Sequence, residues 1–438
     1  RPRYASEFAE IFRNSAIHAE TLQGLDAPHS PELLANIGAH MDHMPEFHQN
    51  FWQGTATLFR RQLLVQFRNT PFIVGRVIMI LVMGLLYSST FYQFDPKQIQ
   101  VVMGIIFAAV LFLSLGQASQ IPTFIAARDI FYKQRKANFF RTSSYVIANS
   151  AAQIPMAIGE TILFGTLVYW MCGFATKGVE FLVFEIVLLL TNLAFSAWFF
   201  FLSAISADNN IATPLSMVSI LIYIIFAGFI VTKSQIPDYF IWLHWISPVA
   251  WSLRGLAVNQ YRSAKYDECV YDNVNYCTQY NSQSMGEYYL NLFDIPSEKF
   301  WVPYAMVYMI AVYVVFMTLS YFALEYKRYE APENINMGKK DEIEDGYIAT
   351  STPKSSVSDK SREDVILEVQ TAELNFTPGS ILLNGYEAND LAIRRSTGYC
   401  EQMDIHSEAS TIREALTFSA FLRQDASVPA NVKFDSVN

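Results

Sequence analysis

The sequence has few charged residues, few cysteines and no basic block. Only 16% of its 438 residues are Asp, Glu, Lys or Arg, whereas about 25% is usual in a soluble domain. This deficit favours a membrane protein. Four cysteines are too few for a disulfide framework. A net charge of −9 argues against a nucleic-acid-binding protein.

A cleavable signal peptide and a metal site are also missing. The first 50 residues contain no apolar stretch, and the first long apolar run begins only at Phe72. The chain starts with Arg1 rather than Met, so we expect it to be a fragment. Four histidines between residues 29 and 48 fit no standard ligand spacing and have no cysteine beside them. We therefore expect no metal ion to bind there.

Long apolar runs dominate the middle of the chain. Each is close to the 20 or so residues that a helix needs to cross a hydrocarbon core of about 30 Å. They predict an α-helical polytopic membrane protein with six spans. Before the first span, apolar residues at helical spacing with arginines between them predict a basic amphipathic helix at the membrane surface over Phe51–Arg68. We place the spans at 72–92, 99–119, 144–172, 180–206, 211–231 and 301–324.

Three ionisable residues fall within these spans. Because charge is costly in lipid, Arg76, Glu160 and Glu185 should face protein, a cavity or an interface. Arg76 lies near the start of its span, and we expect its side chain to reach toward the interface. Glu160 lies deeper, and a contact with substrate is the less favoured of its interpretations.

The distribution of Lys and Arg predicts the orientation. Loop 121–143 is rich in basic residues, as are the segments that flank the first and last spans. Such segments stay in the cytoplasm, which places both termini inside. The loops at 93–98, 173–179 and 232–300 then lie outside.

Loop 232–300 is the largest of the outside loops. Its tryptophan-rich first half predicts a re-entrant or interfacial helical pair rather than a seventh span. Its second half contains Cys269 and Cys277 in an oxidising compartment. We expect a disulfide within the chain, and the competing interpretation is a bond between two copies.

The C-terminal region reads as soluble. A linker poor in apolar residues, expected to be disordered, covers 326–364. The segment 365–438 predicts a short strand at Ile381–Leu383 and a helix at Ser410–Arg423, whose Thr411 and Glu414 have capping-box spacing. So small a core is marginal alone, which indicates a piece of a larger α/β domain.

Two stretches of this region carry a family resemblance. Residues 398–406 and 411–423 resemble the Q-loop region of the second nucleotide-binding domain in ATP-binding-cassette transporters of subfamily G, in the full-size pleiotropic-drug-resistance branch. The resemblance implies that Gln402 is the Q-loop glutamine. That residue would help hold the Mg²⁺ of bound ATP and relay the nucleotide state to the membrane domain.

The membrane half shows similar matches. The stretch that contains Asp129, Phe131, Tyr132 and Arg135 resembles the coupling helix between the second and third spans, which docks on an ATPase. The stretch 227–230 resembles the end of the fifth span, where relatives carry a valve of two apolar residues. Phe229 and Ile230 take those positions, and ordinary lipid-facing packing is the alternative.

By this resemblance the chain divides into five parts. Residues 1–50 follow a first nucleotide-binding domain, and 51–71 form the connecting helix. Residues 72–325 are a six-span domain of the ABC-2 exporter type. The linker 326–364 then precedes a truncated nucleotide-binding domain at 365–438.

The departures from the family pattern concern the motor, that is, the nucleotide-binding domains that hydrolyse ATP. No G-x-x-x-x-G-K-[ST] occurs in the sequence, so there is no loop to cradle phosphates. The signature and Walker B motifs are absent as well. We interpret the junction of Pro378 and Gly379 as an internal deletion. We expect no catalytic residues and no ATP hydrolysis in this chain, and expect ATP and Mg²⁺ to belong to the complete parent protein.

The leading hypothesis is the membrane domain of an ATP-driven exporter of amphipathic, drug-like or lipid-like compounds, located in the plasma membrane. Its expected partners are membrane lipid, a hydrophobic small molecule, a second membrane domain and complete nucleotide-binding domains, but no nucleic acid. The alternative is an inactive subunit that acts as a regulatory or dominant-negative partner of an intact transporter. A stand-alone channel is disfavoured, because no repeated polar face lines the spans.

Overall fold

The computed structural model describes residues 10–26, 47–271, 274–279, 284–327, 382–383, 386–387 and 410–437. The chain divides into two compact units. One comprises Phe47–Glu330 and Gln402–Asn438, and the other comprises Arg1–Glu46 and Ala331–Glu401. Most of the expected linker, the Pro378–Gly379 junction and Gln402 lie outside the described residues.

The smaller unit contributes three described elements. Helix α2 covers Ala16–Asp26. Strands β3 (Leu382–Leu383) and β4 (Tyr386–Glu387) pair antiparallel, with Leu383 opposite Tyr386. The Asn384-Gly385 turn signal stands between the two strands in the sequence, as a two-residue hairpin connection requires.

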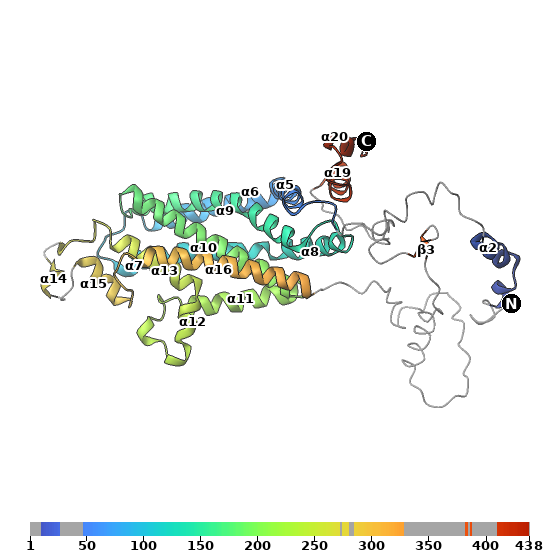
Figure 1. Ribbon diagram of the computed structural model, residues 1–438. Helices are drawn as coiled ribbons and strands as arrows, with labels where there is room; N and C mark the ends of the chain where they lie inside the picture. Colours follow the sequence, from blue (N-terminus) through green and yellow to red (C-terminus); the bar gives the residue numbers. More distant parts are fainter. Residues whose placement is uncertain are drawn as a thin grey trace, which may run out of the picture. The chain divides into compact units, whose positions relative to one another are not determined.

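The larger unit is a helical bundle (Figure 1). Five helical segments within the described residues are long and apolar enough to cross a membrane, and a sixth, α11, is shorter. At about 1.5 Å per residue, the 17 residues of α11 extend about 26 Å. The helices are α5 (Phe51–Arg68), α6 (Thr70–Thr90), α7 (Ile99–Gln117), α8 (Ile121–Lys136), α9 (Thr142–Cys172), α10 (Gly178–Ile205), α11 (Asn209–Ile225) and α16 (Trp301–Tyr326).

Two spans end at other places than the sequence predicts. The second does not stop at residue 119, because the 3-10 turn η1 (Ala118–Gln120) continues the helix directly into α8. The fifth was expected to reach residue 231, but α11 ends at Ile225. Gly228 lies three residues beyond that end with φ +91°, a conformation that favours glycine and is incompatible with a continuing α-helix.

The expected helical pair is present in the segment 232–300. Helix α12 (Ile241–Ile246) leads into α13 (Pro248–Tyr261), whose start is capped by the Ser247 hydroxyl, 3.4 Å from the Ala250 N–H. The remaining elements are η2 (Lys233–Gln235), η3 (Asp238–Phe240), β1 (Val270–Tyr271), β2 (Val274–Asn275), α14 (Tyr276–Gln279) and α15 (Met285–Leu292).

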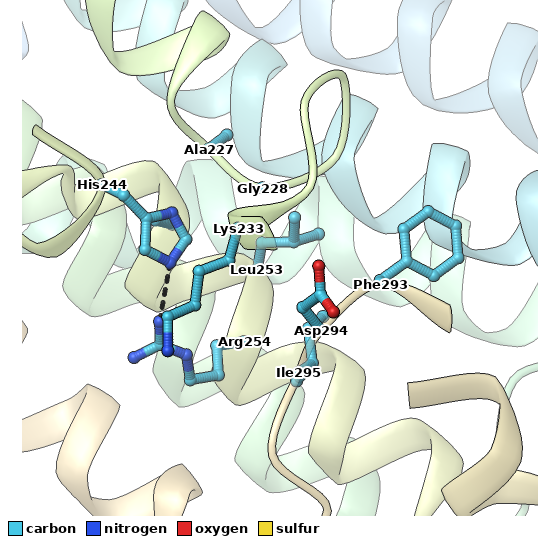
Figure 2. Close-up of a pocket in the computed structure, with 10 residues that line it drawn as sticks. Ala227, Gly228, Lys233, His244, Leu253, Arg254, Phe293, Asp294 and Ile295 are labelled. Carbon is cyan, nitrogen blue, oxygen red and sulfur yellow. Dashed lines mark hydrogen bonds between the residues drawn. The ribbon is translucent and has the colours of Figure 1, made fainter. Parts of the chain in front are cut away.

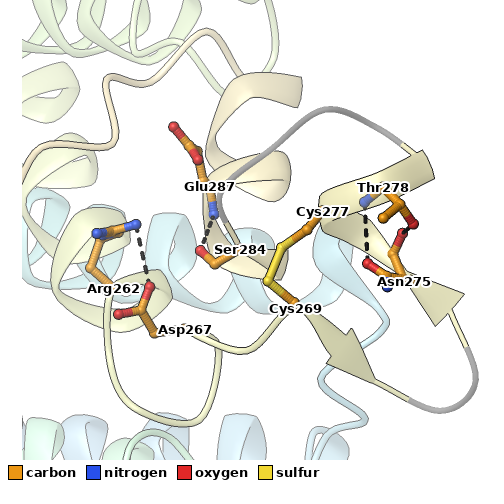
Figure 3. Close-up of a disulfide and its surroundings, with 8 residues drawn as sticks. All are labelled: Arg262, Asp267, Cys269, Asn275, Cys277, Thr278, Ser284 and Glu287. Atoms are coloured by element: carbon orange, nitrogen blue, oxygen red, sulfur yellow. Dashed lines mark hydrogen bonds and ion pairs between the residues drawn. A yellow bond between two sulfur atoms is a disulfide. The ribbon is translucent and has the colours of Figure 1, made fainter.

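A disulfide joins Cys269 to Cys277 within the chain, fixing the β1–β2 hairpin to α14 (Figure 3). Helix α15 approaches the end of α13 at Gly286, where an added Cβ would lie only 1.9 Å from the Tyr261 carbonyl oxygen. Glycine is therefore required at this position for α15 to close over α13.

Two buried apolar clusters hold the bundle. The larger one joins α7, α9, α10 and α13, and the smaller one lies where α5, α8, α9, α10 and α19 (Ile412–Arg423) meet. Helices α6 and α16 instead leave many large apolar side chains exposed, as a face turned to lipid does. These include Ile78, Val82, Leu85, Leu86, Val307, Ile310, Val314 and Val315.

Candidate functional site

The expected coupling segment is the second half of α8. Of its four singled-out residues, Asp129 is exposed and Arg135 is half-buried. Phe131 and Tyr132 are only 1% and 5% exposed. The Phe131 ring lies 4.5 Å from that of Tyr145 on α9. The two aromatic side chains thus pack into the bundle, and Asp129 is the member of the set left on the surface. A docking role for α8 stays a prediction.

Helix α8 is bonded to the ends of two long helices. Arg128 donates hydrogen bonds to the carbonyl oxygens of Ser203 and Ala207, each at 2.7 Å, and also to that of Ser206. These are carbonyls left unpaired at the C-terminal end of α10, where a cation is favoured. Tyr132 donates to the Lys327 carbonyl at the end of α16, at 3.0 Å.

Arg135 forms an ion pair with Glu325 near the same end of α16, at 3.3 Å. Any displacement of α8 therefore acts on both α10 and α16, which pack against each other along the bundle. The sequence indicated Arg128 only as a cytoplasmic charge, and Arg135 also as part of the stretch that resembles the coupling helix. Ser203 and Glu325, the partners on α10 and α16, lie 75 or more residues away along the chain, so no local pattern could have identified these two contacts.

Helix α19, which follows the Q-loop resemblance, packs against α5. Its N-terminus has the expected capping box between Thr411 and Glu414. Glu414 also forms an ion pair with Arg68. The Arg68 guanidinium, together with the Thr411 donors, holds the pKa of Glu414 at about 2. The Arg61 guanidinium lies 4.4 Å from the centre of the Phe418 ring. The contact thus joins charged, aromatic and capping groups of the two helices.

A buried ion pair lies in the bundle interior. Arg76 on α6 donates from Nε and Nη2 to the two carboxylate oxygens of Glu160 on α9, each at 2.8 Å. Its Nη1 donates to the Gly116 carbonyl at 2.7 Å. Gln117 and Asn192 add donors to Glu160 at 2.8 and 3.3 Å. The expectation that Arg76 reaches the interface is wrong, because the Glu160 carboxylate neutralises it inside the protein.

Glu185 on α10 has a sparser environment. Its Oε1 lies 3.5 Å from the Thr166 hydroxyl, and its Oε2 has no hydrogen-bond partner among the described residues. The carboxylate sits against Gly165, where an added Cβ would come within 2.5 Å of it. The half-buried side chain therefore faces protein, one of the environments that the cost of charge in lipid allows.

The two candidate valve residues differ in environment. The Phe229 ring lies 4.8 Å from that of Phe107 and 6.1 Å from that of Phe293, so it packs against the larger core cluster. Ile230 is 56% exposed. Of the two residues, Phe229 is the one that packs against helix α7. A valve formed by this pair stays a prediction.

The helical pair carries a buried arginine that sequence reasoning missed. Arg254 on α13 is 3% exposed, and its Nη2 lies 3.0 Å from His244 Nε2 (Figure 2). Its guanidinium lies over the rings of three tryptophans, Trp245, Trp251 and Trp301, at 4.7, 4.8 and 5.0 Å. The available signal was a single arginine in the otherwise uncharged stretch Pro248–Tyr261, next to a tryptophan-rich run.

The nucleotide-binding candidate Gln402 lies outside the described residues. Among the described residues no group of three His, Cys, Asp or Glu side chains could hold a metal ion. The whole sequence contains no phosphate-cradling loop.

Comparison with known proteins shows which protein family the bundle resembles. Residues 53–261 match the ABC-2 type transporter family. This stretch runs from α5 to the end of α13 and includes α8 and the three buried arginines Arg76, Arg128 and Arg254. Residues 53–261 thus form a membrane domain similar to that of ABC-2 type transporters, and the chain is an integral membrane protein.

Longer matches extend over the rest of the chain. It is 24% identical to ABC transporter G family member 2 of Dictyostelium discoideum, over 99% of this chain and 38% of that protein. It is 23% identical to ABC multidrug transporter G of Aspergillus fumigatus, over 100% of this chain and 38% of that protein. The similarity to ABC transporter G family member 36 of Arabidopsis thaliana is 26%, over 58% of this chain and 18% of the relative. The chain thus spans less than two fifths of the length of these relatives.

Proposed function

We propose that this chain is the membrane-spanning part of a subfamily G exporter of the pleiotropic-drug-resistance branch, which moves amphipathic compounds outward. The observation that carries the proposal is the bonding of α8, inside the matched ABC-2 stretch, to the ends of α10 and α16. A helix held in this way passes a push from an ATPase to two long helices at once. The multidrug name of one relative supports a drug-like or lipid-like substrate.

We further propose that α5, α8 and both termini face the cytoplasm, in the plasma membrane. The α5–α8 end of the bundle holds Arg61, Arg68 and Arg135, as the positive-inside rule requires. The disulfide lies in the segment at the opposite end of the bundle (Figure 1). A structural disulfide suits an oxidising, extracellular environment.

In this proposal the motor comes from elsewhere. The alignment with the Dictyostelium relative runs over 514 positions, against 438 residues in this chain. The difference requires at least 76 positions at which the relative has residues and this chain has none. This supports an internal deletion such as the one expected between Pro378 and Gly379. ATP and Mg²⁺ would then act in complete nucleotide-binding domains, on a parent chain or a partner.

Reconstituted vesicles test the proposal. The chain is inserted alone, or together with an intact subfamily G partner that carries functional nucleotide-binding domains, and ATP-dependent movement of a cationic amphipathic dye is recorded. We expect no movement with the chain alone and movement with the pair above that of the partner alone. Equal movement with and without the chain would contradict the transport role.

The missing phosphate loop favours one second candidate, a regulatory or dominant-negative subunit. Such a chain would bind an intact transporter through its membrane domain and contribute no motor. Co-expression with a complete transporter separates the two candidates. Co-purification with decreased dye export supports the regulatory role, and unchanged or increased export excludes it.

A further inference from the structure

A small pocket lies between α12, α13 and the segment that follows α15. The enclosed space is only about 10 Å³, and the wider hollow around it, about 240 Å³, includes open solvent. Figure 2 shows side chains from four separate stretches converging on it. Its polar lining consists of Lys233, His244, Arg254 and Asp294, and its apolar lining includes Leu253 and Phe293.

Arg254 brings an unused hydrogen-bond donor to this pocket. Its side chain is more than nine-tenths buried, yet Nη1 has no hydrogen-bond partner among the described residues. The arginine side chain has no acceptor atom, so Arg254 must donate to His244 Nε2. The imidazole is therefore neutral, with its proton on Nδ1. It donates this proton to the Phe226 carbonyl oxygen, 3.0 Å away. A buried donor left unpaired is costly.

The charges around the pocket are not balanced. Neither Arg254 nor Lys233 forms an ion pair in the described part of the chain. Asp294 is occupied by Ser234, whose Oγ and N–H lie 2.6 and 3.0 Å from its carboxylate. This bonding lowers the pKa of Asp294, which stays ionised. Two cations against one carboxylate leave a net positive charge.

The surroundings indicate a lipid surface. Lys233 and Arg254 both lie over the ring of Trp245, at 5.1 and 4.7 Å. Tryptophan and tyrosine concentrate at the depth of lipid head groups. Large apolar and aromatic side chains beside the pocket are exposed, as contact with lipid tails requires. They are Ile230, Tyr239, Phe240, Trp242 and Ile246.

We propose that this pocket binds the phosphate group of a phospholipid head, with Arg254 Nη1 and the Lys233 ammonium as donors. Arginine and lysine are the usual cationic partners of phosphate oxygens. Under the proposed orientation the lipid belongs to the outer leaflet. That assignment rests on the proposed function, whereas the binding itself does not.

The site also reaches the turn that carries Phe229. The His244 ring packs under Gly228, where an added Cβ would come within 3.1 Å of its Cε1. His244 thus links Arg254 to the backbone at Phe226 and Gly228. A bound phosphate would fix the guanidinium, and through His244 it would hold this turn in place.

The test measures lipid binding to the purified full chain in a maltoside detergent, which contains no phosphate. Short-chain phosphatidylcholine, a diacylglycerol with the same acyl chains, and inorganic phosphate are titrated separately. Bound molecules are counted by native mass spectrometry, and affinity is read from tryptophan fluorescence. We expect saturable binding of phosphatidylcholine, with diacylglycerol and inorganic phosphate each at least tenfold weaker.

Variants locate the binding. Arg254→Gln should weaken phosphatidylcholine binding at least tenfold, because a buried charge-assisted hydrogen bond contributes the larger share of the affinity. Lys233→Gln, a change on the pocket rim, should weaken it by about threefold. Arg262→Gln is the matched control, because Arg262 pairs with Asp267 at 3.4 Å outside the pocket (Figure 3). It should leave the affinity unchanged. If Arg254→Gln does not fold, the affinities of Arg254→Lys and Lys233→Gln for phosphatidylcholine decide whether this pocket binds the lipid.

Equal affinity for diacylglycerol would overturn the proposal, as would unchanged binding in the Arg254 and Lys233 variants. Inorganic phosphate binding as tightly as the lipid would replace the head-group site by a site for a free anion. No ATP and no partner enter this assay. A failure of lipid binding is therefore distinguishable from a failure of transport.

Discussion

Arg76 and Arg254 are both buried in one helical bundle, but their surroundings differ. All three nitrogen atoms of the Arg76 guanidinium donate, two of them to Glu160 and one to the Gly116 carbonyl. Arg254 lies among three tryptophan rings, and among the described residues its one hydrogen-bond partner is His244, with none for Nη1. In the part of the chain that the structure describes, a carboxylate neutralises Arg76, and none neutralises Arg254.

This difference separates a group that holds the fold from one that is available to a ligand. Breaking a buried pair leaves an uncompensated charge and destabilises strongly, whereas removing both partners is often nearly neutral. A cation held by aromatic faces keeps its attraction for an anion. We therefore expect stability to depend chiefly on Arg76 and lipid binding chiefly on Arg254.

The largest expected effect comes from separating Arg76 and Glu160. Arg76→Met or Glu160→Met alone should lower the free energy of unfolding by about 3–5 kcal/mol. The double variant should recover most of this loss, because it buries no unpaired charge. Unfolding in mixed detergent micelles measures all three. Gly75→Ala is the control, since an added Cβ there meets nothing within 4 Å. Additive losses in the double variant would show that the two side chains act independently.

Arg128 is an intermediate case, a buried guanidinium that donates to carbonyl oxygens at the end of α10. Arg128→Gln should cost about 1.5–3 kcal/mol, the usual contribution of hydrogen bonds to a charged group. It should also decrease dye export by the reconstituted pair, because α8 is released from α10. Arg60→Gln, a change on the exposed face of α5, is the matched control. Full export with normal stability would exclude the transmission path through α10.

Gly116→Ala tests the packing around Arg76 without changing any charge. The added Cβ would come within 2.7 Å of Arg76 Nη1, so the guanidinium must shift from its carbonyl and carboxylate partners. We expect a loss of about 1–3 kcal/mol in the free energy of unfolding. Gly159→Ala, where the new Cβ meets nothing within 4 Å, should be neutral or slightly stabilising. Equal effects of the two changes would exclude tight packing at Gly116.

The smallest effect concerns the exposed pair of Arg68 and Glu414. The pKa of Glu414 is lowered to about 2, from 4.5. Because the pKa of Glu414 is lower in the folded state, its ionised form stabilises the contact at every pH above the ordinary pKa of about 4.5. This contribution is lost as the pH falls from about 4.5 toward 2. Protection of α19 from proteolysis should be constant between pH 5 and 8 and decrease below pH 4.5. In Glu414→Gln this acid-dependent step should be absent, and its persistence would assign the step to another group.

The sequence allowed most of the bundle to be predicted, because apolar length decides which helices can span a membrane. The boundaries of the second and fifth spans were less accessible. Residues 118–120 contain no helix-breaking pattern and continue into α8. The fifth span ends at Ile225, ahead of Gly228, whose positive φ composition does not show.

The site was less predictable than the fold. Arg76 and Glu160 are 84 residues apart, and nothing local in the sequence pairs them. Phe131 and Tyr132 were identified by position, but their inward packing, which includes the contact of Phe131 with Tyr145 on α9, was not. The Arg254 site depends on four stretches meeting in space, which only the folded chain reveals.

The rate of ATP hydrolysis tests the central claim most directly, that this chain is a transport part driven by a motor it lacks. It is measured with the purified chain alone and with an intact nucleotide-binding partner. We predict no turnover by the chain alone, and turnover stimulated by the amphipathic dye in the assembled pair. Hydrolysis by the chain alone, abolished by Gln402→Ala, would contradict this account.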